Sequence, residues 1–191
     1  AELTALSETC HKYGLYLFLD GARLGYGLAA PDNDLTLPDI AALCDVFYIG
    51  GTKVGALFGE AVVIKNPELA QDFRYIIKQN GGMLAKGRLL GLQFDALFTD
   101  GLYQEISAHA IAMAEKLREA FTAKGYNYLA PNRTNQIFVI VPDAHLAKIS
   151  EQFEYSYDQR IDATHSCVRF CTSWATKEEN VDSLIRCVEK L

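Results

Sequence analysis

The sequence lacks the features that mark nucleic-acid-binding, membrane and disulfide-bonded proteins. It has no long run of Lys or Arg, and 18 basic residues face 24 acidic ones for a net charge of -6, which argues against nucleic acid as a partner. Its apolar stretches are far too short to cross a bilayer. Its five cysteines include no CxxC pair, so neither a disulfide framework nor a structural zinc site is expected. We therefore expect a cytoplasmic protein that binds neither nucleic acid nor membrane, and we assign no metal-ligating residue in its sequence.

The sequence also lacks an ordinary beginning. It opens at Ala1 without a methionine, directly inside a helical pattern formed by Leu3, Leu6 and Cys10. No strand or capping sequence precedes this pattern. We expect the chain to be the C-terminal part of a longer protein.

What is present suits a folded α/β protein. With 191 residues and 50% hydrophobic content, the chain can bury a core as one domain or two small ones. A helix should end at Gly14, and the apolar run 15–19 predicts a strand buried on both faces. A short helix over 38–43 then leads to a second buried strand at 46–49. Because a helix separates the two strands, we expect them to be parallel, with Asp20 and Lys53 leaving the same edge of one sheet.

The rest of the chain predicts a change of architecture. An antiparallel strand at 61–64 precedes a helix from Pro67 to about 77, and a second helix should run from 83 to 98. A long helix then ends near Gly125. Strands at 126–129, 135–141 and 167–171 alternate with helices at 143–153 and 177–191. We place a boundary near residues 99–102, between the end of a large α/β domain with a mostly parallel sheet (1–99) and a small α+β domain (100–191).

Lys53 is the first candidate for chemistry. It follows Gly50, Gly51 and Thr52 at the end of a strand, in a glycine-rich loop that lets the backbone approach a flat ring closely. We expect partial desolvation there to lower the pKa of Lys53 toward that of a neutral, nucleophilic amine. An exposed loop lysine is the plainer interpretation. A phosphate loop is disfavoured, because the GxxxxGK[ST] order is absent.

Asp20 and Arg23 form the second candidate. A carboxylate at the end of an apolar strand needs a dedicated partner, and a pyridinium nitrogen is one. Arg23 would sit on the same rim, where its planar fork matches a carboxylate. The alternatives are a loop-capping role for Asp20 and an ordinary surface ion pair for Arg23.

Arg169 is the third candidate. It lies in the middle of a strand, on the face opposite Val168 and Phe170. A charged side chain there requires an anion, which is either an internal Asp or Glu or the α-carboxylate of an amino acid.

Four motifs resemble the low-specificity threonine aldolases, a family of β-eliminating lyases with the aspartate-aminotransferase-like fold that depends on pyridoxal 5'-phosphate (PLP). They are Leu17-Phe18-Leu19-Asp20-Gly21-Ala22-Arg23, Gly51-Thr52-Lys53 with Gly55, Gly81-Gly82-Met83, and Val168-Arg169-Phe170 followed by Thr172. They occur in the family's order along the whole chain.

The resemblance implies a role for each candidate. Lys53 would carry PLP as a Schiff base, and Asp20 would pair with the pyridinium nitrogen. Arg23 and Thr52 would join them in binding the cofactor, and Arg169 with Arg23 would hold the substrate carboxylate. The family's Gly-Thr phosphate loop and ring-stacking histidine lie upstream of this region. Leu84 stands where the family often has a phosphate-binding arginine.

The expected reaction is cleavage of a β-hydroxy-α-amino acid such as threonine to glycine and an aldehyde. The resemblance also implies a homo-oligomer, a dimer or a tetramer. Two alternatives stay open. One is another PLP reaction on the same fold, such as transamination, desulfuration or β-elimination. The other is a non-catalytic fragment that acts in oligomerisation.

Overall fold

The computed structural model describes residues 2–191, and Ala1 lies outside the described residues. The chain divides into two compact units. The first contains the residues up to Leu28 together with Asn33–Gln104, and the second contains Ala29–Asp32 and Glu105–Leu191. The division falls just inside the long helix α7 (Leu102–Ala123), three to six residues after the predicted boundary at 99–102.

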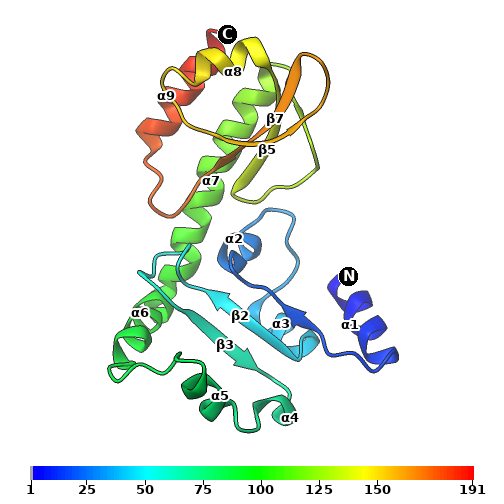
Figure 1. Cartoon of the computed structure of the whole chain (residues 1–191). Coiled ribbons are helices and arrows are strands. Elements are labelled where there is room, and N and C mark those ends of the chain that lie inside the picture. Colours follow the sequence, from blue (N-terminus) through cyan, green and yellow to red (C-terminus); the bar gives the residue numbers. More distant parts are fainter. Residues whose placement is uncertain (1) are drawn as a thin grey trace. The chain divides into compact units, whose positions relative to one another are not determined.

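A three-stranded sheet organises the first unit (Figure 1). Its order is β1 (Phe18–Leu19), β2 (Val46–Gly50) and β3 (Glu60–Ile64). β1 and β2 are parallel, and β2 and β3 are antiparallel, as the sequence predicted. The helices before and between the first two strands are α1 (Glu2–Lys12), α2 (Leu24–Leu28) and α3 (Leu37–Leu43).

Local sequence explains the crossover between β1 and β2. The hydroxyl of Thr36 caps α3 by accepting from the backbone N–H of Asp39, whose carboxylate accepts in return from the N–H of Thr36. The hydroxyl of Ser7 on α1 donates to the carbonyl of Leu43 at 2.7 Å.

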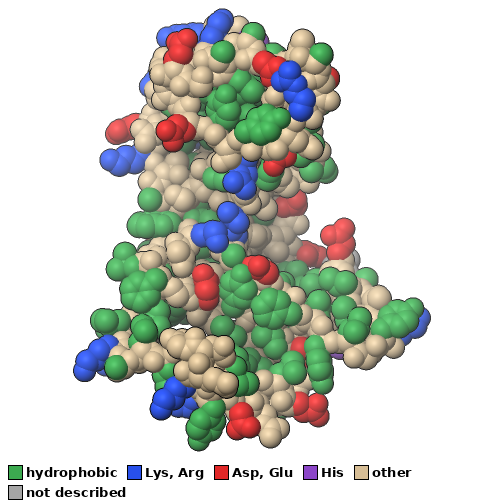
Figure 2. Space-filling model, in the orientation of Figure 1, with side chains coloured by type: hydrophobic (Ala, Val, Ile, Leu, Met, Phe, Trp, Pro, Cys, Tyr) green, Lys and Arg blue, Asp and Glu red, His purple; other side chains and the backbone are tan. Residues whose placement is uncertain are grey.

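The two faces of β2 differ in burial. Phe47 and Ile49 are buried, whereas Tyr48 is only half-buried. Figure 2 shows hydrophobic side chains exposed over the part of the molecule that holds this sheet.

Two predictions about β1 and Lys53 were wrong. The predicted strand 15–19 shrinks to Phe18–Leu19, and Leu15, Tyr16 and Phe18 are more than half exposed. The reason is that β1 pairs with β2 on one side only, among the described residues. Lys53 is exposed rather than partly desolvated.

The helices after β3 also differ from prediction. The expected helix from Pro67 to 77 is two helices, α4 (Pro67–Ala70) and α5 (Phe73–Gln79), because Asp72 takes a left-handed conformation with φ 57°. α6 covers Arg88–Phe98 and begins five residues later than expected. A turn that closes with the N–H of Gly87 on the carbonyl of Leu84 occupies the stretch before it.

The second unit is an antiparallel sheet covered by helices on one face (Figure 1). Its strands, in sheet order, are β4 (Asn127–Tyr128), β5 (Gln136–Pro142), β7 (His165–Cys171) and β6 (Ser156–Arg160). Its helices are α7, α8 (Asp143–Ile149) and α9 (Glu178–Glu189). Alternate residues of β5 and β7 bury themselves against the apolar stripes of these helices. Strand β6 was not predicted, because all five of its residues are exposed and show no alternation.

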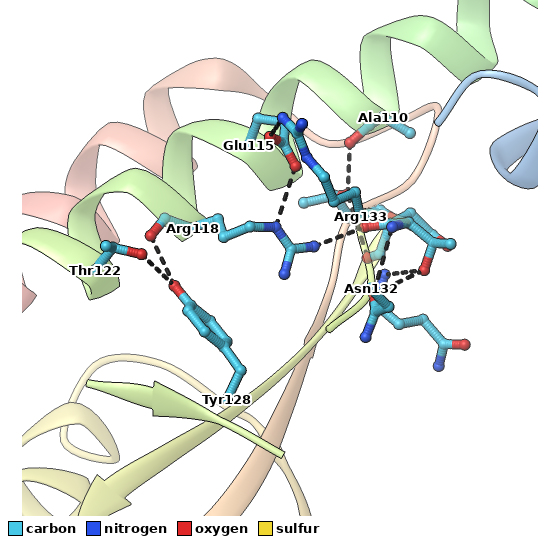
Figure 3. Close-up of polar contacts among 11 residues, drawn as sticks. Ala110, Glu115, Arg118, Thr122, Tyr128, Asn132 and Arg133 are labelled. Atoms are coloured by element: carbon cyan, nitrogen blue, oxygen red, sulfur yellow. Dashed lines mark hydrogen bonds and ion pairs between the residues drawn. The ribbon is translucent and has the colours of Figure 1, made fainter. Parts of the chain in front are cut away.

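An ionic cluster ties α7 to the loop before β5 in this unit (Figure 3). Glu115 accepts from Arg118 Nε at 3.1 Å and from Arg133 Nη2, and Arg118 also donates to the carbonyl of Thr134 at 3.1 Å. Burial raises the pKa of Glu115, but the two arginines outweigh it and hold that pKa below its usual range. The cluster therefore depends on an ionised Glu115.

Candidate active site

Two loops meet at the carboxyl ends of β1 and β2. The N–H of Gly50 donates to the carbonyl of Gly21 at 2.9 Å. A Cβ on Gly21 would lie 1.7 Å from the carbonyl oxygen of Tyr48, and one on Gly50 would lie 2.4 Å from the carbonyl oxygen of Ala22. Only glycine allows these backbones to touch. The segment from Asp20 to Arg23 and the segment from Gly51 to Lys53 are thus brought together, as their places at strand ends predicted.

A buried tyrosine links α2 to the end of β2, next to these two loops. The hydroxyl of Tyr103 accepts from the N–H of Gly25 and donates to the carbonyl of Gly50, both at 3.0 Å. Tyr103 is only 1% exposed, and burial raises its pKa to about 12. A second buried tyrosine, Tyr26, donates its hydroxyl to the backbone carbonyl of Lys53. Sequence reasoning missed both residues, since an aromatic side chain in an apolar stripe predicts core packing alone.

The lysine loop is held tightly although the side chain of Lys53 is exposed. The N–H groups of Val54 and Ala56 both donate to the carbonyl of Gly51, at 2.9 and 3.0 Å. The N–H of Gly51 donates to the carboxylate of Glu60 on β3 at 2.8 Å. The hydroxyl of Thr52 lies 3.5 Å from the carbonyl of Gly59. These contacts fix the backbone of the loop, and the side chain of Lys53 remains exposed.

Asp20 is an ionised carboxylate with fixed donors. The hydroxyl of Tyr48 donates to Asp20 Oδ1, and the N–H of Ala22 donates to the same oxygen at 3.0 Å. The hydrogen bond from Tyr48 is the main cause of a lowered pKa for Asp20, and the positive charges of Lys53 and Arg23 lower it further. Asp20 therefore does cap its own loop, as one alternative held, and it does so with one oxygen only.

Arg23 stands at the start of α2, half-buried. It forms no ion pair with any residue between 2 and 191, so the alternative of an ordinary surface salt bridge has no support. The positive charge of Arg23 helps to lower the pKa of Asp20, which lies at the same end of the sheet.

Arg169 belongs to the second unit, and its surroundings there are unusual for an arginine. It lies opposite Phe138 and Ser156 in the sheet, with its guanidinium carbon 5.9 Å from the centre of the Phe138 ring. Its Nε is buried without a hydrogen-bond partner, and no described Asp or Glu pairs with it. Arg169 also lines an open pocket of about 390 Å³. The alternative of an internal acidic partner has no support among the described residues.

The histidines have structural contacts. His165 is the first residue of β7, where Asp162 Oδ1 accepts from its backbone N–H at 2.8 Å and contacts its Nδ1 at 3.0 Å. Within residues 2–191, no helix combines the length and the apolar character that a membrane crossing requires.

Residues 1–144 match the family described as beta-eliminating lyase. A low specificity L-threonine aldolase of Pseudomonas sp. (strain NCIMB 10558) is 33% identical over 187 residues, which cover 96% of this chain and 52% of that protein. The protein of the same description from Pseudomonas aeruginosa is 31% identical over 186 residues, or 97% and 53%.

Solved structures agree with these relatives. The threonine aldolase of Leishmania major has a TM-score of 0.96 and 42% identity over 99% of this chain and 55% of its own. The tryptophan decarboxylase of Catharanthus roseus, at 14% identity and a TM-score of 0.73, shares the fold over 98% of this chain and 45% of its own. The chain therefore spans about half the length of the relatives it matches.

Proposed function

Because this chain belongs to the beta-eliminating lyase family, we propose that it is part of a PLP-dependent aldehyde lyase. Its substrate is a β-hydroxy-α-amino acid such as threonine, which it cleaves to glycine and an aldehyde. The observation that carries the proposal is the backbone contact between Gly21 and Gly50, which brings the carboxylate of Asp20 and the loop of Lys53 to one end of the sheet.

The resemblance and the fold class predicted from sequence are both confirmed. The family match covers residues 1–144, and the likeness to the Leishmania major enzyme extends over 99% of the chain. Only part of that fold is present here, since the chain corresponds to 55% of the neighbour. The cofactor, the reaction and the residue roles are therefore proposals for the whole protein.

The residues of the first unit fit PLP in three respects. A primary amine, Lys53, is exposed on a loop whose backbone is fixed, and such an amine can attack an aldehyde. An ionised carboxylate, Asp20, can accept from a protonated ring nitrogen. Gly21 and Gly50 keep both groups at one sheet end. Thr52, beside Lys53, and Arg23, three residues after Asp20, are the remaining cofactor-binding residues that we propose.

The chemistry divides between cofactor and protein. When bound, PLP supplies a sink for the electrons of the broken Cα–Cβ bond. Asp20 keeps a proton on the ring nitrogen by offering it a carboxylate. Arg169 and Arg23 are the residues that we assign to the α-carboxylate of the amino acid, because a guanidinium group can hold a carboxylate in two parallel hydrogen bonds, and such an orientation would select the bond that breaks. The unpartnered Nε and the aromatic neighbour of Arg169 support this role.

Product analysis tests the reaction. The full-length protein that contains this chain should convert threonine to glycine and acetaldehyde when PLP is supplied. 2-Oxobutyrate and ammonia from threonine would instead indicate β-elimination, and 2-oxo-3-hydroxybutyrate would indicate transamination. Alanine formed from cysteine would indicate desulfuration. Lys53→Ala should abolish the reaction, and Lys65→Ala, at an exposed residue just after β3, is the matched control that should not.

A non-catalytic role in oligomerisation is the second rival. It predicts that the full-length protein assembles but binds no PLP, which equilibrium dialysis of the cofactor would reveal.

We propose that the enzyme is a cytoplasmic homo-oligomer, a dimer or a tetramer. Light scattering on the purified protein tests the assembly, and a monomeric mass at working concentration would contradict it.

A further inference from the structure

Tyr48 contacts Asp20 but has no role in the proposed chemistry. It lies on β2, and its hydroxyl donates to Asp20 Oδ1 at the end of the neighbouring strand. Its ring packs at 6.1 Å from the ring of Phe18, tilted by 42°. The side chain is half-buried whereas Asp20 is exposed. Tyr48 is therefore a well-packed donor aimed at a carboxylate that has few other supports.

The two carboxylate oxygens of Asp20 differ in their hydrogen bonds. Oδ1 accepts from the hydroxyl of Tyr48 and from the N–H of Ala22, the latter at 3.0 Å. No donor among residues 2–191 is bonded to Oδ2. Two donors on one oxygen fix the rotation of the carboxylate, so Oδ2 keeps its lone pairs for a third donor in a defined direction.

The backbone of Tyr48 adds to this constraint. Its carbonyl oxygen presses on Gly21, the residue after Asp20, so closely that a Cβ there would lie 1.7 Å from it. Tyr48 thus confines both the side chain of Asp20 and the backbone that carries it.

The charges around the pair set the direction of the hydrogen bond. Lys53 and Arg23 lower the pKa of Asp20, while the negative charges of Asp20 and Glu60 help to raise the pKa of Tyr48. The hydrogen bond to Asp20 is the largest cause of that rise, to about 12. The phenol therefore keeps its proton at neutral pH and acts only as a donor, and Asp20 remains the acceptor.

We propose that Tyr48 is a positioning residue that holds Asp20 with Oδ2 directed at the pyridinium nitrogen of the cofactor. This inference rests on the proposed function, because it assigns Tyr48 a task only where Asp20 meets that nitrogen. Tyr48 itself touches neither cofactor nor substrate in this scheme. Its effect on the cofactor passes through Asp20 and vanishes when Asp20 cannot perform its role.

A double-mutant cycle on PLP affinity tests the proposal. Tyr48→Phe keeps the ring against Phe18 and removes only the hydroxyl, and Asp20→Asn keeps the shape of the carboxylate and removes its charge. In the full-length protein, Tyr48→Phe should weaken PLP binding about tenfold, as expected for a lost hydrogen bond to a charged group. In the Asp20→Asn background the same change should weaken it less than twofold. Tyr75→Phe, at an exposed tyrosine of the same unit, is the matched control and should have no effect.

A cofactor analogue separates positioning from folding. With 1-deaza-PLP, which has carbon in place of the ring nitrogen, Tyr48→Phe and the parent protein should bind equally well. Equal weakening for PLP and the analogue, or equal weakening with and without Asp20, would make the hydroxyl a general structural support and overturn the proposal. If Tyr48→Phe leaves PLP binding unchanged, the role of Tyr48 is overturned and the proposed function stands. If the parent protein binds no PLP, the proposed function is overturned as well.

Discussion

Gly21→Ala should separate the two loops that form the candidate active site. The new Cβ would lie 1.7 Å from the carbonyl oxygen of Tyr48, 2.9 Å from its carbonyl carbon and 3.3 Å from Leu24 Cβ. The two nearest atoms belong to the backbone of β2, so no side-chain rotation can relieve the overlap. Either β2 or the loop after β1 must move.

The size of the effect follows from the kind of atoms that overlap. Overpacking of a well-packed site usually costs about 1–3 kcal/mol, and an overlap with rigid backbone belongs at or beyond the upper end, so we expect a loss of about 3 kcal/mol or more in the free energy of unfolding. The same shift should break the hydrogen bond from Gly50 to Gly21 and weaken PLP binding.

Urea unfolding followed by far-ultraviolet circular dichroism measures this loss. Gly27→Ala is the matched control, because Gly27 lies in α2 with nothing within 4 Å of its added Cβ. Alanine there should leave stability unchanged or raise it by up to about 1 kcal/mol through helix propensity. If Gly21→Ala unfolds at the same urea concentration as Gly27→Ala, the close contact between the loops does not exist and the reasoning is refuted.

Three further perturbations address other parts of the structure. Tyr103→Phe leaves the N–H of Gly25 and the carbonyl of Gly50 buried without their partner and should cost about 2–3 kcal/mol of unfolding free energy in the same assay; a loss below about 0.5 kcal/mol would contradict the bridging role. Glu115 has a lowered pKa, so the stability from its ion pairs is fully present above its ordinary pKa of 4.5 and is lost as the pH falls through the lowered value. In a plot of the thermal unfolding midpoint against pH, Glu115→Gln should therefore reduce the fall of the midpoint at acid pH. An unchanged fall would contradict the linkage. Arg169→Lys keeps the charge but loses the planar fork, so KM for threonine should rise about tenfold or more with a smaller change in kcat, and an unchanged KM would remove Arg169 from substrate binding.

Strand order and strand ends were readable from sequence. The parallel pairing of β1 with β2 followed from an intervening helix, and the convergence of Asp20 and Lys53 followed from their places after parallel strands. Both inferences use local patterns plus one rule of topology. The exposure of β1 could not be predicted from sequence, because an apolar run does not reveal which other elements pack against it.

The supports of the site were not readable. Tyr48 sits in an apolar strand and Tyr103 in a helical stripe, where a tyrosine predicts packing and its hydroxyl partner is undetermined. The bond from Tyr103 to Gly50 spans 53 positions in the chain, and no spacing rule anticipates it. The break at Asp72 was equally hidden, since a left-handed residue other than glycine gives little local signal.

The covalent partner of the cofactor is the most direct test of the whole account. The full-length protein, incubated with PLP and reduced with borohydride, should yield after digestion a single pyridoxyl-labelled peptide, the one that contains Lys53. Mass spectrometry would identify it, and Lys53→Ala should abolish the label while Lys65→Ala should retain it. Label on a different lysine, or none at all on a folded protein, would contradict the assignment of this site.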